Sequence, residues 1–220
     1  MGGYLVIVTD TDTKDPVSNA IVTLHADDTL SIRLPNSRQL DYADQTTVTV
    51  LLTKDKSAVE GMFVTMTDKH DNYCAGNTDS NGQVTVPGTS GKTNEDGKVT
   101  AGYEDADGDR WTLTIKVEHT DTGRPIPNAE VAIGKTGNIT VKLPDGTDLD
   151  KNHRVTVTVT DHKKNPQENR NIIVKGDLSQ TAKGKTDQDG KLTVPEIEER
   201  ERHGAYILGY TDGTFGPSRS

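Results

Sequence analysis

The sequence predicts an all-β protein made of two tandem antiparallel β-sandwiches. The first observation behind this prediction is an internal repeat in which equivalent residues lie 109 positions apart. Each copy is long enough to form a domain with its own core, and the repeat is longer than the units that stack into solenoids. The pairs that share this offset are Pro16 and Pro125, Asn19 and Asn128, Leu34 and Leu143, and Val48 and Val157.

The second observation is an alternation of apolar and polar residues with a period of two. Thr47–Leu51 and Arg154–Val159 place valine on one face and mostly threonine on the other. This pattern is typical of half-buried antiparallel strands. Because only 30% of the residues are hydrophobic and 4% are aromatic, we expect a thin, aliphatic core.

The opening of each copy predicts three short strands. Runs rich in valine, isoleucine and threonine are separated by turns that contain aspartate, glycine and proline. The third strand of each copy stops at a proline, which lacks the N–H group needed to continue a central ladder. These strands are expected at Tyr4–Thr9, Ala20–His25 and Leu30–Leu34, and at Trp111–Glu118, Ala129–Ile133 and Ile139–Leu143.

Two central strands and an aromatic closing strand complete each predicted sandwich. The central pair follows the proline and is separated by a charged loop, and the closing strand carries a Gly-Tyr pair. The expected positions are 46–52, 62–66 and 99–103 in the first copy, and 154–160, 171–175 and 205–210 in the second.

A repeated Asn-Gly or Asp-Gly turn precedes the last part of each copy. Thr78–Pro87 reads T-D-S-N-G-Q-V-T-V-P and Thr186–Pro195 reads T-D-Q-D-G-K-L-T-V-P, with a shorter echo at Thr93–Ala101. Such dipeptides between alternating segments are strong hairpin signals. We therefore expect a hairpin turn at each of these positions.

The acidic segment Glu104–Arg110 separates the two copies and is expected to be a tight linker. It divides the chain into a first domain at residues 1–106 and a second at 107–220. Seven or eight short strands per copy, with a turn every eight to twelve residues, match the immunoglobulin-like sandwich.

Charge and motif content exclude several classes of function. The net charge is −9, so nucleic acid and anionic membranes would repel the chain, and no apolar run approaches the roughly 20 residues that cross a bilayer. The six histidines lack zinc-site spacing, and no G-x-S-x-G motif is present. We therefore expect a protein that is not an enzyme and has no cofactor.

Two stretches resemble modules of bacterial surface proteins. Lys116–Val131, with its T-G-R-P-I turn, resembles the opening of collagen-adhesin B-type and carboxypeptidase-regulatory-like modules. Val155–Pro166 and the T-D-x-D-G-K motif that follows are similar to invasin/intimin-type Ig-like repeats. Both resemblances imply small β-sandwiches on a bacterial surface.

The adhesin resemblance also implies a candidate crosslink at Lys116. Modules of that family often join a lysine to an asparagine or aspartate through an isopeptide bond between the first and last strands, and Lys116 occupies the lysine position. The equivalent residue of the first copy is Ile7, and the sequence identifies no partner. An exposed strand lysine is the competing interpretation.

Gly209–Pro217 reads G-Y-T-D-G-T-F-G-P and resembles the middle of the S-layer homology motif. This resemblance implies that the chain comes from a protein associated with the bacterial cell wall. The repeat offers a second explanation for part of the match, because Gly209-Tyr210 aligns with Gly102-Tyr103 at an offset of 107. Thr214–Pro217 is explained only by the resemblance.

Asp105, Asp107 and Asp109 form a candidate calcium site within the predicted linker. Closely spaced carboxylates are the ligands that calcium prefers. The loop lacks the full EF-hand pattern, and aspartate and glycine are also the residues of ordinary turns. Both interpretations stay open at this point.

The expected function is a non-catalytic spacer of a secreted bacterial cell-surface protein, extracellular and associated with the cell wall or S-layer. Its partners would be neighbouring domains of the same polypeptide, and we expect a monomer. The alternative is an adhesive or carbohydrate-binding module that contacts a cell-wall polymer or host ligand through the loops Asp41–Asp44 and Asp145–Asp150.

Overall fold

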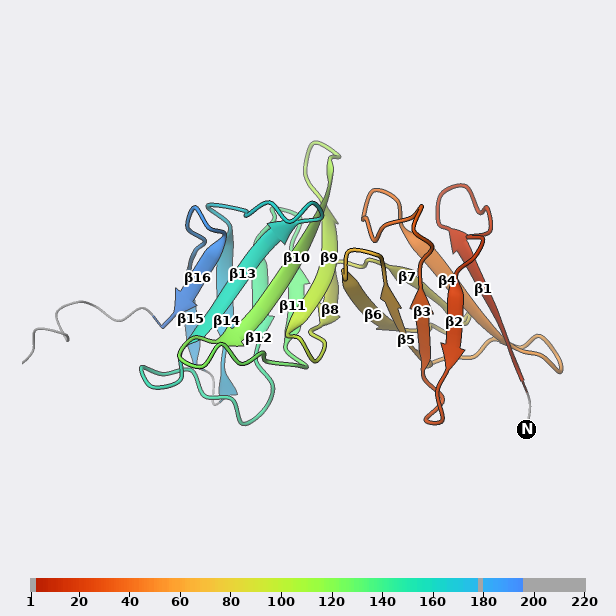
Figure 1. The fold of residues 1–220 in the computed structure, drawn as a ribbon, viewed down its shortest axis with the longest axis horizontal. Coiled ribbons are helices and arrows are strands. Elements are labelled where there is room, and N and C mark those ends of the chain that lie inside the picture. Colours follow the sequence, from red (N-terminus) through yellow and green to blue (C-terminus); the bar gives the residue numbers. More distant parts are fainter. Residues whose placement is uncertain (1–2, 178–179, 196–220) are drawn as a thin grey trace, which may run out of the picture.

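The computed structural model describes residues 3–177 and 180–195, and it confirms the all-β prediction. These residues form 16 strands in four sheets, and no helix occurs among them (Figure 1). No described segment is therefore a helix long and apolar enough to span a membrane. The sheets lie in two pairs, and each pair encloses its own cluster of buried apolar side chains.

The first pair of sheets, here called the N-terminal sandwich, contains seven strands. One sheet has the order β1-β4-β7 and the other has the order β2-β3-β5-β6. The strands are β1 (Tyr4–Asp10), β2 (Ile21–Leu24), β3 (Leu30–Arg33), β4 (Thr46–Leu52), β5 (Phe63–Thr67), β6 (Tyr73–Asn77) and β7 (Gln83–Val86).

The second pair, here called the C-terminal sandwich, repeats this order and adds one strand to each sheet. Its sheets have the orders β16-β13-β10-β9 and β15-β14-β12-β11-β8. The strands are β8 (Ser90–Lys92), β9 (Lys98–Glu104), β10 (Arg110–His119), β11 (Glu130–Ile133), β12 (Ile139–Lys142), β13 (Val155–Asp161), β14 (Asn171–Lys175), β15 (Thr181–Lys185) and β16 (Lys191–Val194).

The alternating pattern positions the core as predicted. In β13, Val155, Val157 and Val159 are fully buried against the facing sheet. In the equivalent strand β4, Val48 and Val50 are buried in the same way. Valine therefore faces inward on both central strands, which is the arrangement that a period of two requires.

The sequence analysis predicted antiparallel sheets, and the structure has one parallel pair of strands in each sandwich beside the antiparallel ones. β3 pairs with β5 in parallel, and β12 pairs with β14 in parallel. The cause is the path of the chain: after β3 it crosses to the other sheet as β4 and returns as β5 in the original direction. Sequence periodicity reports which residues are buried but not the direction of the neighbouring strand.

The predicted linker is a hairpin connection within the C-terminal sandwich. β9 and β10 pair along their length, with Glu104 opposite Arg110, so the acidic segment between them is a turn. β8 pairs with β11. The strand expected to close the first copy is therefore part of the second pair of sheets, and the chain passes between the two sandwiches at residues 87–89 rather than at residues 106–107.

The repeated Asn-Gly and Asp-Gly turns connect the two sheets of a sandwich and do not form hairpins of paired strands. β6 and β7 lie in different sheets, as do β8 and β9, and β15 and β16. The turn glycines Gly82, Gly97 and Gly190 have positive φ and accept backbone N–H groups from β4, β10 and β13. A turn occurs at each predicted position. The carbonyl of its glycine accepts a hydrogen bond from a third strand, and the chain leaves the turn in the other sheet of the sandwich.

Candidate functional site: the junction between the sandwiches

The outer face of β9 and β10 is polar and yet buried. Thr100, Thr112 and Thr114 expose 1%, 4% and 5% of their surface, and Gly102 lies among them. Threonines on the outer face of a β-sheet, at the edge of a sandwich, would normally be exposed to water. Here two loops of the N-terminal sandwich, before β4 and before β6, cover them (Figure 1).

In the first loop, the side chain of Tyr42 packs directly against Gly102 of β9. A Cβ atom added to Gly102 would lie 2.1 Å from Cβ of Tyr42, so the tyrosine occupies the space that a side chain on β9 would fill. The backbone N–H of Tyr42 donates to Thr112 Oγ1 at 2.8 Å, and the Thr112 hydroxyl donates to Asp41 Oδ1 at 2.7 Å. Glycine permits this close approach of two backbones.

The second loop inserts a buried amide. Asn72 is fully buried, and its Oδ1 accepts hydrogen bonds from the Thr114 hydroxyl at 3.3 Å and from Lys164 Nζ at 3.4 Å. The Thr100 and Thr114 hydroxyls share a hydrogen bond of 3.1 Å, and Thr100 Oγ1 accepts the N–H of Tyr73. This network joins the loop before β6 of the N-terminal sandwich to β9, β10 and the loop that contains Lys164 in the C-terminal sandwich.

Asp68 stabilises the conformation of the second loop through hydrogen bonds. It is fully buried, and its carboxylate accepts N–H groups from the backbone of Leu40, His70 and Asn72 and from Nδ2 of Asn72. In the described part of the chain, every buried side-chain nitrogen and oxygen has a hydrogen-bond partner. The junction is therefore a polar contact whose groups are satisfied, which makes it specific in orientation.

The candidate calcium residues are not brought together as a metal site. Asp105 accepts the N–H groups of Asp107 and Asp109 through Oδ1 and the indole N–H of Trp111 through Oδ2 at 2.8 Å. These hydrogen bonds, led by that of Trp111, lower the pKa of Asp105. No group of three acidic, histidine or cysteine side chains in the described residues is arranged to hold a metal. The geometry is that of a turn capped by Asp105.

We expect millimolar calcium and a chelator to leave the thermal unfolding midpoint unchanged. A ligand that binds only the folded state would raise the midpoint, and a carboxylate already engaged by three N–H donors has little capacity for one. Differential scanning calorimetry with calcium and with chelator measures this directly. A rise in the unfolding midpoint on addition of calcium would contradict this expectation and would support the calcium-site interpretation.

The Asp105 cap should also depend on pH. Because the folded-state pKa is lowered, the cap stabilises the fold above the unfolded-state pKa of about 3.9 and is lost as the pH falls through the folded-state value. Trp111 is the only tryptophan, so its fluorescence follows the cap. We expect an emission change below about pH 4 that the variant Asp105→Ala does not show.

Lys116 forms an ion pair within its own strand. It lies on β10 with its side chain 37% exposed, and its Nζ contacts the Glu118 carboxylate. Its cross-strand neighbours are Thr158 and Lys98, neither of which offers a carboxamide or carboxylate. The arrangement matches the interpretation of Lys116 as a strand lysine that faces solvent.

The three other segments predicted to carry function lie in different parts of the chain. Asp41 and Tyr42 belong to the junction, so this part of the loop Asp41–Asp44 is engaged within the molecule. The loop Asp145–Asp150 lies between β12 and β13 of the C-terminal sandwich. Gly209–Pro217, which carries the S-layer resemblance, lies outside the described residues.

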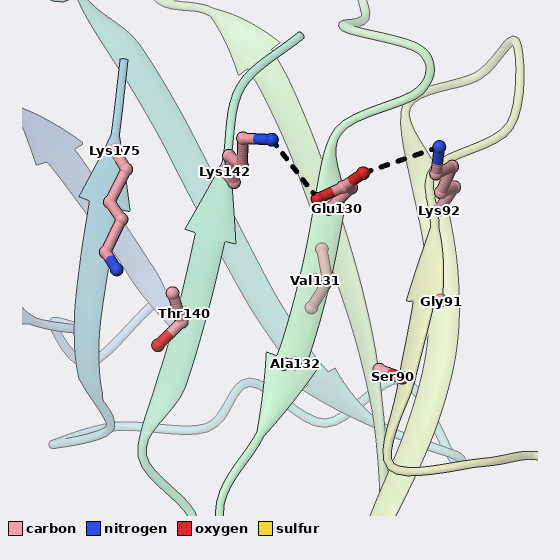
Figure 2. A pocket seen from close by; sticks show the side chains of 9 residues that line it. All are labelled: Ser90, Gly91, Lys92, Glu130, Val131, Ala132, Thr140, Lys142 and Lys175. Atoms are coloured by element: carbon pink, nitrogen blue, oxygen red, sulfur yellow. Dashed lines mark ion pairs between the residues drawn. The ribbon is translucent and has the colours of Figure 1, made fainter. Parts of the chain in front are cut away.

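A shallow hollow lies on the outer face of the larger C-terminal sheet, over β8, β11, β12 and β14 (Figure 2). It measures about 440 Å³, and the exposed residues Ser90 and Ala132, which lie opposite each other on β8 and β11, have short side chains that leave the space. Glu130 pairs with Lys92 at 3.4 Å and with Lys142 at 3.6 Å. All three side chains are at least half exposed, so water competes for these pairs and the face is a solvated sheet surface.

Sequence reasoning missed the junction. Thr100, Thr112 and Thr114 alternate as solvent-facing threonines do, and nothing in their spacing reveals that another domain covers them. One signal was available: Gly102 interrupts a strand pattern, and a glycine in a strand often marks the close approach of another backbone.

Comparison with known proteins adds no family. No family model, curated protein or solved structure matches this sequence. The functional argument therefore depends on the geometry of the chain itself.

Proposed function

We propose that this chain is a non-catalytic spacer module of a secreted bacterial cell-surface protein associated with the S-layer. The observation that carries the proposal is the junction: Tyr42 seated on Gly102, with Asp41 and Asn72 bonded to the threonines of β9 and β10. A spacer must hold its ends at a fixed separation, and a junction with directional hydrogen bonds resists bending more than a flexible linker does.

The chain path supports the same function. Only residues 87–89 connect the two sandwiches, because β8 and β9 are built into the second. So short a connection limits the relative rotation of the two bodies. The net charge of −9 favours a soluble chain that avoids anionic surfaces, which suits a spacer between other domains.

The proposed placement on a bacterial surface is supported by the resemblances of Lys116–Val131, Val155–Pro166 and Gly209–Pro217 to surface modules. Antibody labelling of intact cells that carry the protein tests this placement. Labelling before lysis supports it, and labelling only after lysis contradicts it.

Rigidity is tested by the distance between spin labels on the two sandwiches. Asn36 and Glu168 are exposed loop residues, one in each sandwich, and both can be replaced by cysteine. The native Cys74 is buried, and burial raises the pKa of its thiol, so it should not react with the label. We expect one narrow distance distribution from double electron–electron resonance. A broad distribution would mean that the sandwiches move independently and would refute the rigid spacer.

A further inference from the structure

The outer face of the larger C-terminal sheet is positively charged, although the chain as a whole is negative. The ionisable residues of its five strands are five lysines and one glutamate, whereas the net charge of the chain is −9. All six side chains are exposed, because they alternate with the residues that face the core. They are Lys92 on β8, Glu130 on β11, Lys142 on β12, Lys175 on β14, and Lys183 and Lys185 on β15.

Four of these residues form a row across the sheet (Figure 2). Glu130 lies opposite Lys92 and Lys142, and Lys142 lies opposite Lys175. Three steps between neighbouring strands place the ends of the row about 14 Å apart. Glu130 pairs with Lys92 and Lys142, but Lys175 forms no ion pair with any described residue. Lys142 and Lys175 are therefore like charges side by side, which costs stability that a bound anion would restore.

The row forms one side of the shallow hollow on this face. Ser90, Ala132 and Thr140 lie one step further along their strands on the same face, and their short side chains form the floor. The hydroxyl groups of Ser90 and Thr140 make no hydrogen bond with any described residue. An extended polymer can therefore lie beside the lysines with free hydroxyl groups beneath it.

The repeat shows that the fold does not require this charge. The equivalent sheet of the N-terminal sandwich, β2-β3-β5-β6, has one charged residue in its strands, Arg33. The same positions form the same sheet without the lysines, so the charge is particular to the C-terminal sandwich. The counterparts of Glu130, Lys142, Lys175, Lys183 and Lys185 are, in that order, Ile21, Arg33, Thr67, Ala75 and Asn77.

The net charge and the charge of this face act over different distances. At an ionic strength of 0.1 M, charges are screened over about 10 Å, so an anion in contact with the face is affected mainly by the lysines. Elsewhere on the chain it meets the excess of acidic residues. Asp145 lines a smaller hollow with Lys92 and Lys142, so the positive charge is strongest towards β14 and β15. The net charge therefore limits an anionic ligand to one face and does not exclude it.

The composition of the face favours a polysaccharide over other anions. The five described strands contain no aromatic residue on which a nucleobase could stack and no arginine, the cation that protein interfaces favour. Ile173, which is 38% exposed, is the one large apolar side chain exposed on these strands, and it offers little anchorage to a protein or a bilayer. Lysines beside hydroxyl groups match a polymer that carries carboxylates and hydroxyls.

We propose that the outer face of β8, β11, β12, β14 and β15 binds a linear acidic polysaccharide through its lysines. The strongest contacts are those of Lys175, Lys183 and Lys185, which no described carboxylate neutralises. This surface differs from the loops that the sequence suggested for carbohydrate contact. The inference does not rest on the spacer proposal, because it concerns the outer face of one sandwich and not the junction between the two.

Isothermal titration calorimetry of the full chain with polygalacturonate tests the proposal. This linear polymer carries one carboxylate on each sugar, and its methyl-esterified form is the same backbone without the charge. In 0.1 M salt we expect binding to polygalacturonate and at least about tenfold weaker binding to the esterified form. Raising the salt to 0.5 M should weaken binding, since the lysines are exposed and are screened.

The three lysines nearest β15 are tested together in the variant Lys175→Thr, Lys183→Ala, Lys185→Asn. Each replacement is the residue at the equivalent position of the N-terminal sandwich, so the sheet should stay folded, and the unfolding midpoint checks this. We expect the affinity for polygalacturonate to fall at least about tenfold. The matched control removes three exposed loop lysines of the N-terminal sandwich and should change the affinity less than about twofold. Its substitutions are Lys54→Thr, Lys56→Asn and Lys69→Ala.

Glu130→Gln should strengthen binding about two- to threefold. The carboxylate of Glu130 lies 3.4 Å from Lys92 and 3.6 Å from Lys142, so its removal frees both ammonium groups for the polymer. A substitution that merely disturbed the sheet would not raise the affinity. This gain therefore separates a role in binding from a role in folding.

Every outcome decides for or against the proposal. Loss of affinity in the sheet variant but not in the loop control, together with the gain in Glu130→Gln, supports it. Absence of binding, equal losses in the two triple variants, or equal binding of the esterified polymer overturns it. Tighter binding of a single-stranded oligonucleotide or of phosphatidylglycerol vesicles also overturns it, because a different anion would then be the preferred occupant. None of these results alters the spin-label distance across the junction, so the two proposals fail separately.

Discussion

Gly102→Ala is expected to separate the two sandwiches while each of them stays folded. The added Cβ would lie 2.1 Å from Cβ of Tyr42, a distance that real Cβ atoms do not tolerate, and the neighbouring atoms at 2.3 Å and 2.5 Å belong to the same side chain. The side chain of Tyr42 must move away from residue 102. The hydrogen bonds that join Thr112 to Tyr42 and Asp41 are then lost as well. The spin-label distance distribution should become broad, and the radius of gyration from X-ray scattering should rise.

The control for this experiment is Gly88→Ala, in the segment that connects the sandwiches. An added Cβ at Gly88 meets no atom closer than 3.6 Å, which is an ordinary contact. We expect this variant to keep the narrow distribution. If Gly102→Ala keeps it as well, Tyr42 does not set the orientation of the sandwiches, and the proposed rigid junction is wrong.

The second large effect is expected at the repeated Asp-Gly turn. Gly190 has φ of 71°, and an added Cβ would lie 2.4 Å from the backbone oxygen of Val159. Gly190→Ala combines left-handed strain with a clash against backbone that cannot move aside. We expect it to lower the free energy of unfolding of the C-terminal sandwich by about 3–4 kcal/mol. Urea unfolding followed by Trp111 fluorescence measures the change.

Gly146→Ala separates the two causes. Gly146 has φ of 82°, but an added Cβ would meet nothing within 4 Å. It should therefore cost only the conformational strain, about 1 kcal/mol. If both variants lose the same amount, the close approach to Val159 contributes nothing and the turn glycine is needed for its φ angle alone.

The same clash recurs in the other copies of the turn. Added Cβ atoms at Gly82 and Gly97 would each lie 2.4 Å from a backbone oxygen, of Val50 and Val117 respectively. The motif that the sequence repeats three times is thus one structural device. It turns the chain from one sheet to the other and docks on the strand that it passes.

The sequence was informative where structure depends on local pattern. The alternation of valine and threonine correctly predicted which faces of β4 and β13 are buried, because side chains alternate across a strand whatever its neighbours are. The prolines correctly marked the ends of β3 and β12, and glycine at positive φ occurs in the turns predicted from Asp-Gly. These features depend on residues close together in the chain.

The sequence was misleading where structure depends on which edge a strand joins. Val99–Tyr103 was correctly expected to be a strand, but it was assigned to the first copy because it precedes the acidic segment. The acidic segment was interpreted as a linker and a candidate calcium site because turns and calcium loops use the same residues. Only the pairing of β9 with β10 shows that Asp105 caps a hairpin turn.

By itself, therefore, the sequence determined the all-β class, the repeat and the inward-facing residues of the central strands. The tertiary structure alone decided the sheet that receives β8 and β9, the direction of the β3–β5 pair, and the seating of Tyr42 on Gly102. The physical reason is that alternation specifies one face of a strand, whereas its two edges carry the same backbone groups in every sequence. Edge pairing is selected by the space that the rest of the fold leaves open.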